Sequence, residues 1–218
     1  MLKIDLHTHS VISPDGGISA KQYRKALESG QLSCVAVTDH NQIDFAVQLN
    51  KELGPRIIVG EEIMTSAGEI IGLFLTEVVP PGLTPKETIR HIKDQGGLVY
   101  IPHPFETVRK GLSRTMLDEL VDDIDVVEIY NGRAVFQNKT EKALEWTLSN
   151  RKPGAASSDA HGPKGLGRTY TTVTDIPRRD TLASLLHTAT FTVTRPRTRA
   201  ILYPKYHRLR KRFGGRDE

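Results

Sequence analysis

The sequence contains a single cysteine, Cys34, among 218 residues. One cysteine excludes an internal disulfide and any metal site built from a cluster of thiolates, so a metal ion in this chain must bind to histidine and carboxylate side chains. Cys34 itself lies in the apolar segment SCVAV and is predicted to be a small core residue.

Long apolar runs, repeats and low-complexity tracts are also absent. No run approaches the 18 apolar residues that a membrane-spanning helix needs, so we expect no membrane contact. The first residues, MLKIDLHTHS, contain no apolar stretch of signal-peptide length, which predicts a cytoplasmic protein. Apolar residues make up 38% and charged residues 26% of the chain, and this composition fits one large globular domain.

Positive charge is concentrated toward the C-terminus. The formal net charge is +4, but residues 195–218 hold nine Lys or Arg and two acidic residues, a balance of +7, so the remainder carries −3. We therefore expect a folded unit over residues 1–194 and a basic tail over residues 195–218. A basic tail attracts polyanions such as nucleic acid or phosphorylated ligands, and a solvated terminus is the alternative.

Short β-rich runs alternate with helical patterns. The predicted strands cover residues 3–6, 34–37, 56–59, 70–75, 98–101, 126–130 and 154–156, with Val173 in an eighth. Capping residues Ser19, Thr84 and Ser113 predict three helix starts, and residues 138–150 and 178–188 read as further helices. The alternation indicates an α/β fold with parallel strands and right-handed crossovers. Seven or so units favour a closed or nearly closed barrel, with an open doubly wound sheet as the alternative.

Five of the eight histidines directly follow a predicted strand. They are accompanied by acidic residues, and the five are His7, His9, His40, His103 and His161. In a parallel barrel the C-terminal strand ends share one rim, where sites are built, so these side chains are expected to converge. His7 and His9 are two residues apart in an extended segment and can face the same point. Imidazole and carboxylate together suit Zn, Mn or Fe, so the pattern predicts a metal site.

Six motifs occur in the order DLHTHS, SPDG, TDHN, GEEI, IPHP and SSDAH. As a set, from residue 5 to about residue 173, they resemble the PHP (polymerase and histidinol phosphatase) superfamily of phosphoesterases. VEIYNGR and SDAHGPKGLGRTYT are most similar to its stand-alone members. The resemblance implies a distorted (β/α)7 barrel of mostly parallel strands with the metal site at the C-terminal strand ends.

The resemblance also implies two or three divalent metal ions: Mn, Zn or Fe, with Mg as an alternative. His7, His9 and Asp159 match the ligands of one ion, and Glu62 matches the carboxylate that bridges two ions, with His103 beside it. Asp15, His40 and His161 match the ligands of another. The full set of implied metal ligands is His7, His9, Asp15, His40, Glu62, His103, Asp159 and His161.

Several neighbouring positions have a second interpretation. Asp15 lies in a Pro-Asp-Gly turn and is either a ligand or a plain turn residue. Asp5 is expected to orient the His7–His9 turn, and Asp39 to hydrogen-bond to a ligating histidine and fix its tautomer. Glu61 should point away from Glu62 because neighbours on a strand alternate faces, and only the family pattern selects Glu62 as the inward one.

Three residues are candidates for substrate binding. Arg133 follows a predicted strand in YNGR, and Arg168 follows two flexible glycines in GLGR. The arginine fork binds two phosphate oxygens at once, and solvent-facing loop cations are the alternative. Asn131 falls where some relatives have a further histidine. An amide is a poorer ligand than imidazole, so two firmly bound ions are expected rather than three.

Clustered divalent ions lower the pKa of bound water to roughly 7 and polarise the electrophile. We therefore expect a metal-dependent phosphoesterase that uses a hydroxide bridging two ions near Glu62, with Asp159 or His161 as catalytic acid. The substrate is a phosphorylated small molecule or a nucleic-acid end, the latter favoured by the basic tail. The alternatives are a histidinol-phosphatase-like phosphatase, an amidohydrolase-like enzyme acting on C–N bonds, and a non-catalytic metal-stabilised binding module.

Overall fold

The computed structural model describes residues 1–134, 138–194 and 198–212, without the side chains of residues 198–201. Within these residues the strands form one sheet. The strands are β1 (Leu2–Asp5), β2 (Cys34–His40), β3 (Ile57–Met64), β4 (Glu69–Leu73), β5 (Leu98–Ile101), β6 (Val126–Asn131), β7 (Gly154–Ser157), β8 (Tyr170–Val173) and β9 (Thr190–Thr192).

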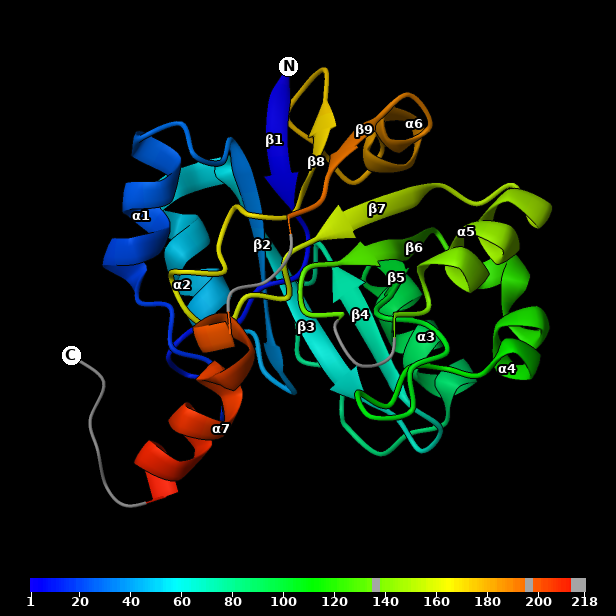
Figure 1. Ribbon diagram of the computed structural model, residues 1–218. Helices are drawn as coiled ribbons and strands as arrows, with labels where there is room; N and C mark the ends of the chain where they lie inside the picture. Colours follow the sequence, from blue (N-terminus) through cyan, green and yellow to red (C-terminus); the bar gives the residue numbers. More distant parts are fainter. Residues whose placement is uncertain (135–137, 195–197, 213–218) are drawn as a thin grey trace.

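The helices are distributed along the whole chain. They are α1 (Ala20–Glu28), α2 (Asp44–Leu53), α3 (Pro85–Asp94), α4 (Arg114–Glu119), α5 (Thr140–Ser149), α6 (Leu182–Leu186) and α7 (Thr198–Arg212), with short 3-10 turns at Gly54–Arg56 and Val121–Asp123. Figure 1 shows α1 and α2 on one side of the curled sheet and α3, α4 and α5 on the other. No helix in the described part of the chain is long and apolar enough to cross a membrane.

The sheet order among the described strands is β7-β6-β5-β4-β3-β2-β1-β8-β9. Strands β1, β2 and β3 pair in parallel, as do β5, β6 and β7. Strand β4 is antiparallel to both of its neighbours, and β8 is antiparallel to β1 and β9. The two parallel groups therefore run in one direction, as the prediction of mostly parallel strands requires.

The sheet curls until β7 approaches the β1–β8 side. There the Thr171 hydroxyl accepts from Ala156 N at 2.8 Å and donates to Ala156 O at 3.0 Å, so a side chain joins β8 to β7. Beyond the strand ends, His9 N donates to Ala160 O at 2.9 Å. The sheet is thus a nearly closed, distorted barrel, which confirms the fold class predicted from the sequence.

Apolar residues fill both faces of the central strands. In β2, Cys34 and Ala36 belong to one buried cluster, whereas Val35 and Val37 belong to another that contains Leu27 of α1. A strand buried on both faces reads as a continuous apolar run, which is why CVAV was recognisable. This packing fixes the strands rigidly, so that the residues at their C-terminal ends are held on one rim of the barrel.

The C-terminal region is partly described. Residues 195–197 and 213–218 of the predicted basic tail lie outside the described residues, and residues 198–212 form helix α7. The division into a barrel and a separate tail stays a prediction.

Candidate metal centre

Glu62, on β3, lies between four imidazoles. Its Oε1 is 3.3 Å from His7 Nε2 and 3.1 Å from His103 Nε2. Its Oε2 is 3.2 Å from His9 Nε2 and 3.3 Å from His40 Nδ1. Each carboxylate oxygen therefore faces a different pair of histidines, which is the arrangement that a carboxylate bridging two cations requires.

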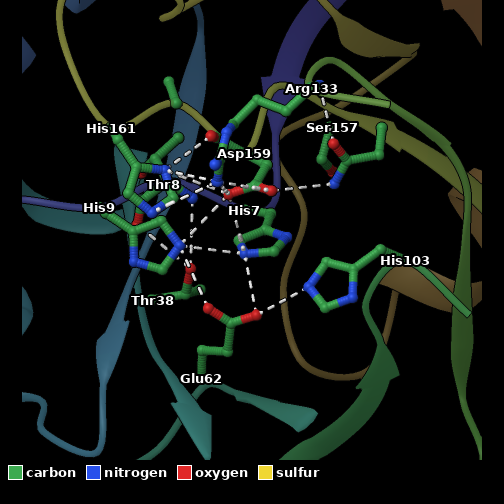
Figure 2. A network of polar contacts seen from close by, with 12 residues as sticks. His7, Thr8, His9, Thr38, Glu62, His103, Arg133, Ser157, Asp159 and His161 are labelled. Atoms are coloured by element: carbon green, nitrogen blue, oxygen red, sulfur yellow. Dashed lines mark hydrogen bonds and ion pairs between the residues drawn. The ribbon is translucent and has the colours of Figure 1, made fainter. Parts of the chain in front are cut away.

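Asp159 faces the same pair of histidines from the loop after β7. Its Oδ1 is 3.6 Å from His7 Nε2 and 3.5 Å from His9 Nε2, and the two Nε2 atoms are 3.1 Å apart. Figure 2 shows the imidazoles of His7, His9 and His103 turned toward Glu62, with Asp159 and His161 across from it. Two imidazole nitrogens and two carboxylates that face one point offer good coordination for a cation.

Asp15 lies in the loop between β1 and α1 and joins a further set of donors. Its Oδ1 is 3.5 Å from His40 Nε2 and its Oδ2 is 3.4 Å from His161 Nε2. The His9 ring stacks on His40 with centroids 4.8 Å apart and lies tilted against His161 with centroids 4.1 Å apart. The Pro-Asp-Gly turn therefore carries its carboxylate into the cluster instead of out to solvent.

The eight sequence-predicted ligands are brought together, and all except the half-buried His40 are buried. Among the described residues, the donor atoms of these eight and of Glu69 form four overlapping groups, and within each group every atom lies within 4.8 Å of the others. The groups are His9–Asp15–His40–His161, His7–Glu62–His103, His7–His9–Asp159 and His40–Glu62–Glu69. A mixed imidazole and carboxylate donor set of this size suits divalent metal ions.

Two of these positions have strained backbones. His103 has φ of +29° and Asp159 has φ of +50°, in the left-handed region that is uncommon for residues other than Gly, although Asn, Asp and His adopt it more often than most. Such conformations cost about 1–3 kcal/mol and persist where the surrounding structure holds them, commonly at functional sites. In both cases the strained residue follows a strand end, where the turn aims its side chain back across the barrel mouth.

Charge crowding shifts the pKa values of the cluster. Burial raises the pKa of Glu62, but the neighbouring His7 and His40 outweigh it and hold that pKa well below its usual range. Burial lowers the pKa of His9, but its bonds with Asp159 and Glu62 outweigh this and raise the pKa to about 10. The Glu62 carboxylate is therefore ionised, and bound cations would neutralise its negative charge.

A second layer of acidic residues supports the ligands. Asp5 Oδ1 accepts from Ser158 N at 2.9 Å and thus ties β1 to the loop that carries Asp159. Glu61 turns away from Glu62, as expected, and accepts from Val79 N at 2.9 Å. Asp39 also lies outside the donor groups, but the expected bond to a histidine is wrong because both of its oxygens accept from Ser10.

Sequence reasoning missed Glu128 and Glu69. Glu128, on β6, accepts from His7 Nδ1 at 3.2 Å, from His103 N at 2.6 Å and from Tyr100 Oη at 3.1 Å. Glu69, at the start of β4, lies 3.6 Å from His103 Nε2, and burial together with Glu62 raises its pKa to about 9. Both acids interrupt or border apolar strands, VVEIYN and EIIGL, and an acid within a buried strand was the available signal.

A pocket of about 420 Å³ opens over the donor cluster and is lined by several cations. They are Arg109, Lys110, Arg133 and Arg208. Arg133 Nη1 lies 3.2 Å from Asp159 Oδ1, and Arg109 Nη1 donates to Asp159 Oδ2 at 2.7 Å. Arg109, which sequence reasoning also missed, comes from the long loop after β5, where no strand end or motif marked it.

The other two predicted substrate residues have different positions. Asn131 is buried beneath the pocket, where it accepts from Arg109 Nη1 at 2.5 Å and donates to Glu128 Oε2 at 2.8 Å. Arg168 lines a small neighbouring cavity with Arg133, His161 and Tyr203. Arg133 and Asn131 thus both contact Asp159, and of the three candidates only Arg133 also lines the pocket over the donor cluster.

Known proteins resemble the chain in both sequence and structure. A protein-family model described as PHP-associated matches residues 137–190. An uncharacterized protein of Methanocaldococcus jannaschii is 39% identical over 150 residues, which cover 63% of this chain and 88% of the relative.

Two solved structures share the fold. A two-domain protein from Bacteroides vulgatus that contains a predicted PHP-like metal-dependent phosphoesterase superposes with a TM-score of 0.72 at 21% identity, covering 95% of this chain and 69% of the other. A lesion-specific endonuclease, endonuclease Q from Pyrococcus furiosus, superposes with a TM-score of 0.58 at 17% identity, covering 88% and 57%. The PHP-associated match over residues 137–190 and the fold shared with a PHP-like protein support a place for the chain in the PHP superfamily, which its six ordered motifs resemble.

Proposed function

We propose that this protein is a metal-dependent phosphoesterase whose substrate is a nucleotide or the end of an oligonucleotide. The observation that carries the proposal is the position of Glu62, whose two oxygens face different pairs of histidines directly beneath a pocket lined by four cations. Such a site offers places for metal ions and for phosphate oxygens side by side. Its volume of about 420 Å³ is within the range of small-molecule sites.

We propose that the eight predicted ligands hold two firmly bound divalent ions, which are Mn, Zn or Fe. When bound, divalent ions at these donors would supply a water nucleophile activated near neutral pH and positive charge for the phosphate oxygens. Glu69 is an additional candidate ligand because it completes a donor group with His40 and Glu62.

Two arginines are placed to bind the phosphate. Arg133 and Arg109 border the pocket, and each has a guanidinium nitrogen on Asp159. The guanidinium fork can hold two phosphate oxygens and fix the phosphorus in line for attack. Asn131 accepts from Arg109 and from the Arg133 backbone, so it orients both arginines from below.

The leaving oxygen must receive a proton. Asp159 and His161 line the pocket beside Arg133, and they are the proposed groups that pass a proton from solvent to that oxygen. Both also belong to donor groups, so substitutions there should affect metal binding and turnover at once.

A nucleic-acid substrate is favoured over a small metabolite by the cations at the pocket mouth. Lys110 and Arg208 extend the positive lining beyond the arginines on Asp159, which suits a substrate with more than one phosphate. Endonuclease Q, which shares this fold, is lesion-specific. Binding of an oligonucleotide should weaken steeply with salt, with a slope of about −0.7 per phosphate contacted in a single strand. A single phosphomonoester should show little such dependence.

The test is a screen of metal-stripped protein with Mn²⁺, Zn²⁺ or Mg²⁺ added back. The substrates are an aryl phosphomonoester, an aryl phosphodiester, nucleotides, histidinol phosphate, short RNA and an aryl amide. We expect metal-dependent turnover of phosphate esters, with nucleotide or RNA preferred, and no turnover of the amide.

Two variants serve as an inactive and an active control for the screen. Asp159→Asn should lose turnover, whereas Asp180→Asn, at a side chain that is 78% exposed, should keep it. Hydrolysis of the amide but of no phosphate ester would assign the C–N chemistry instead. Full activity of the metal-stripped protein would refute a metal-dependent reaction.

A further inference from the structure

Helix α7 lies against the two loops that carry Asp15 and His161. A Cβ atom added at Gly17 would lie 2.1 Å from Cε1 of His207, and one added at Gly162 would lie 2.8 Å from Cδ2 of Tyr203. These two rings of α7 stack on each other with centroids 5.4 Å apart. Figure 1 shows α7 beside the barrel, with the yellow loop after β7 passing close to its first turns. The glycines thus leave the room that the helix occupies.

Lys211 fastens α7 to the Asp15 loop. Its ammonium group donates to three backbone carbonyls of one short segment: Val11 O and Ser13 O at 2.5 Å, and Gly16 O at 2.9 Å. A lysine ammonium has three protons, so these three acceptors can satisfy all of them. Because the three carbonyls flank Asp15 on both sides, the contact fixes the curvature of the turn that presents this carboxylate.

Arg208, one turn away on the same helix, reaches Asp15 itself. Its Nη2 donates to Asp15 Oδ2 at 2.6 Å, and its side chain is 64% exposed at the pocket mouth. Asp15 Oδ2 also faces His161 Nε2. A cation bound at this donor group would compete with Arg208 for the same carboxylate, whereas it would leave the backbone contacts of Lys211 untouched.

We propose that α7 is the positioning element of the His9–Asp15–His40–His161 donor group, and that Lys211 is its principal positioning residue. His40 is the last residue of β2, and His9 follows β1 and is held by the bond from its backbone N to Ala160 O. Asp15 and His161 come from loops, and α7 joins these two loops to each other. The inference concerns how one metal ion is held, and it stands whether or not the substrate is a phosphate ester.

The test counts Mn²⁺ ions bound per full-length chain by isothermal titration calorimetry, with circular dichroism as the folding control. Lys211→Met should weaken the ion at this donor group about tenfold or more, as loss of a supporting contact does at other metal sites, and should leave the remaining ions unchanged. Lys211→Arg, which keeps the charge and the donors, should restore much of the affinity. Lys205→Met, at an exposed position of the same helix, should bind Mn²⁺ like the wild type.

Two further variants separate positioning from general stability. Tyr203→Ala removes the ring packed on Gly162, and we expect it to weaken the same ion through the His161 loop. Arg208→Ala removes the competing cation, so Mn²⁺ affinity should stay equal or rise. Folded Lys211→Met and Tyr203→Ala proteins that bind every ion with wild-type affinity would overturn the proposal, as would equal losses in Lys205→Met. Absence of phosphoesterase activity alongside the expected ion counts would count against the proposed function only.

Discussion

At the scale of single residues, Glu128 supports the metal centre from outside the four donor groups. Its carboxylate is buried and accepts from His7 Nδ1, His103 N and Asn131 Nδ2. A carboxylate behind a ligating histidine fixes the ring and makes its other nitrogen more basic, and removal of such a partner typically costs about 10–100-fold in metal affinity.

Glu128→Gln should therefore bind Mn²⁺ about 10–100-fold more weakly while remaining folded. Calorimetric titration of the stripped protein measures the change, and Glu119→Gln, at an exposed acid of α4, serves as the matched control. Unchanged affinity in the folded Glu128→Gln protein would show that the His7 ring is held by other contacts.

Cys34 provides a pH prediction away from the metal site. Burial raises the pKa of its thiol to about 12, against the lowering effect of Arg56. Because the folded pKa lies above the ordinary value of 9.0, the stability gained from keeping this thiol protonated is full below about pH 9 and is lost as the pH rises toward 12.

Iodoacetamide should consequently fail to label Cys34 in native protein at about pH 8 and should label it fully in urea, because the thiolate is the nucleophile. Mass spectrometry gives the extent of labelling. Stoichiometric labelling of the native protein at that pH would contradict the buried position of the thiol.

The sequence predicted some residues of the site better than others, for physical reasons. His7 and His40 were recognisable because each follows an apolar run that predicts a strand and has an acidic residue close by in the sequence. Glu62 could be separated from Glu61 only by the family pattern, since alternation places one of them inward without saying which. Glu69 directly precedes the predicted strand 70–75 and was not singled out, because a buried acid becomes conspicuous only when its partners, here His40 and His103, are known.

At the scale of elements, helix α3 has the clearest local signal. Thr84 accepts from Glu87 N at 3.3 Å, and the Glu87 carboxylate accepts from Thr84 N at 2.9 Å, so each residue caps the other. Loss of such a cap costs about 0.5–2 kcal/mol. We expect Thr84→Ala to lower the free energy of unfolding by about 1 kcal/mol in urea titrations.

Thr84→Ser keeps the oxygen and should stay close to the wild type. If Thr84→Ala and Thr84→Ser were equally stable, the hydroxyl would contribute nothing and the start of α3 would be fixed by packing of Ile89 and Ile92 alone.

Among the described helices, α2 and α7 were not predicted from the sequence. Helix α2 is preceded by Ile43, which offers no capping side chain, so nothing marked its start. Helix α7 contains Pro204 and many cations, and its Tyr203 and His207 rings pack against Gly162 and Gly17 in two loops, so its sequence read as a basic tail. Strand β4 was predicted as a strand, but its antiparallel direction depends on a hairpin with β3 in place of a helical crossover.

At the scale of the whole molecule, the barrel is what turns separate motifs into one site. His9, Glu62 and Asp159 are far apart in the chain and meet because β1, β3 and β7 run in the same direction around the sheet. The alternation of strands and helices was enough to predict this convergence. The position of α7 over the barrel mouth depends on long-range contacts such as Arg208 with Asp15, which no local pattern encodes.

The most direct test of the central claim is anomalous X-ray scattering from crystals of the protein loaded with Zn²⁺. We predict strong peaks bonded to Glu62, His7 and His9, at distances of about 2.0–2.2 Å from the imidazole nitrogens and carboxylate oxygens. A further peak should lie among Asp15, His40 and His161. Well-ordered crystals with these side chains in place and no anomalous peak within bonding distance of them would contradict the account.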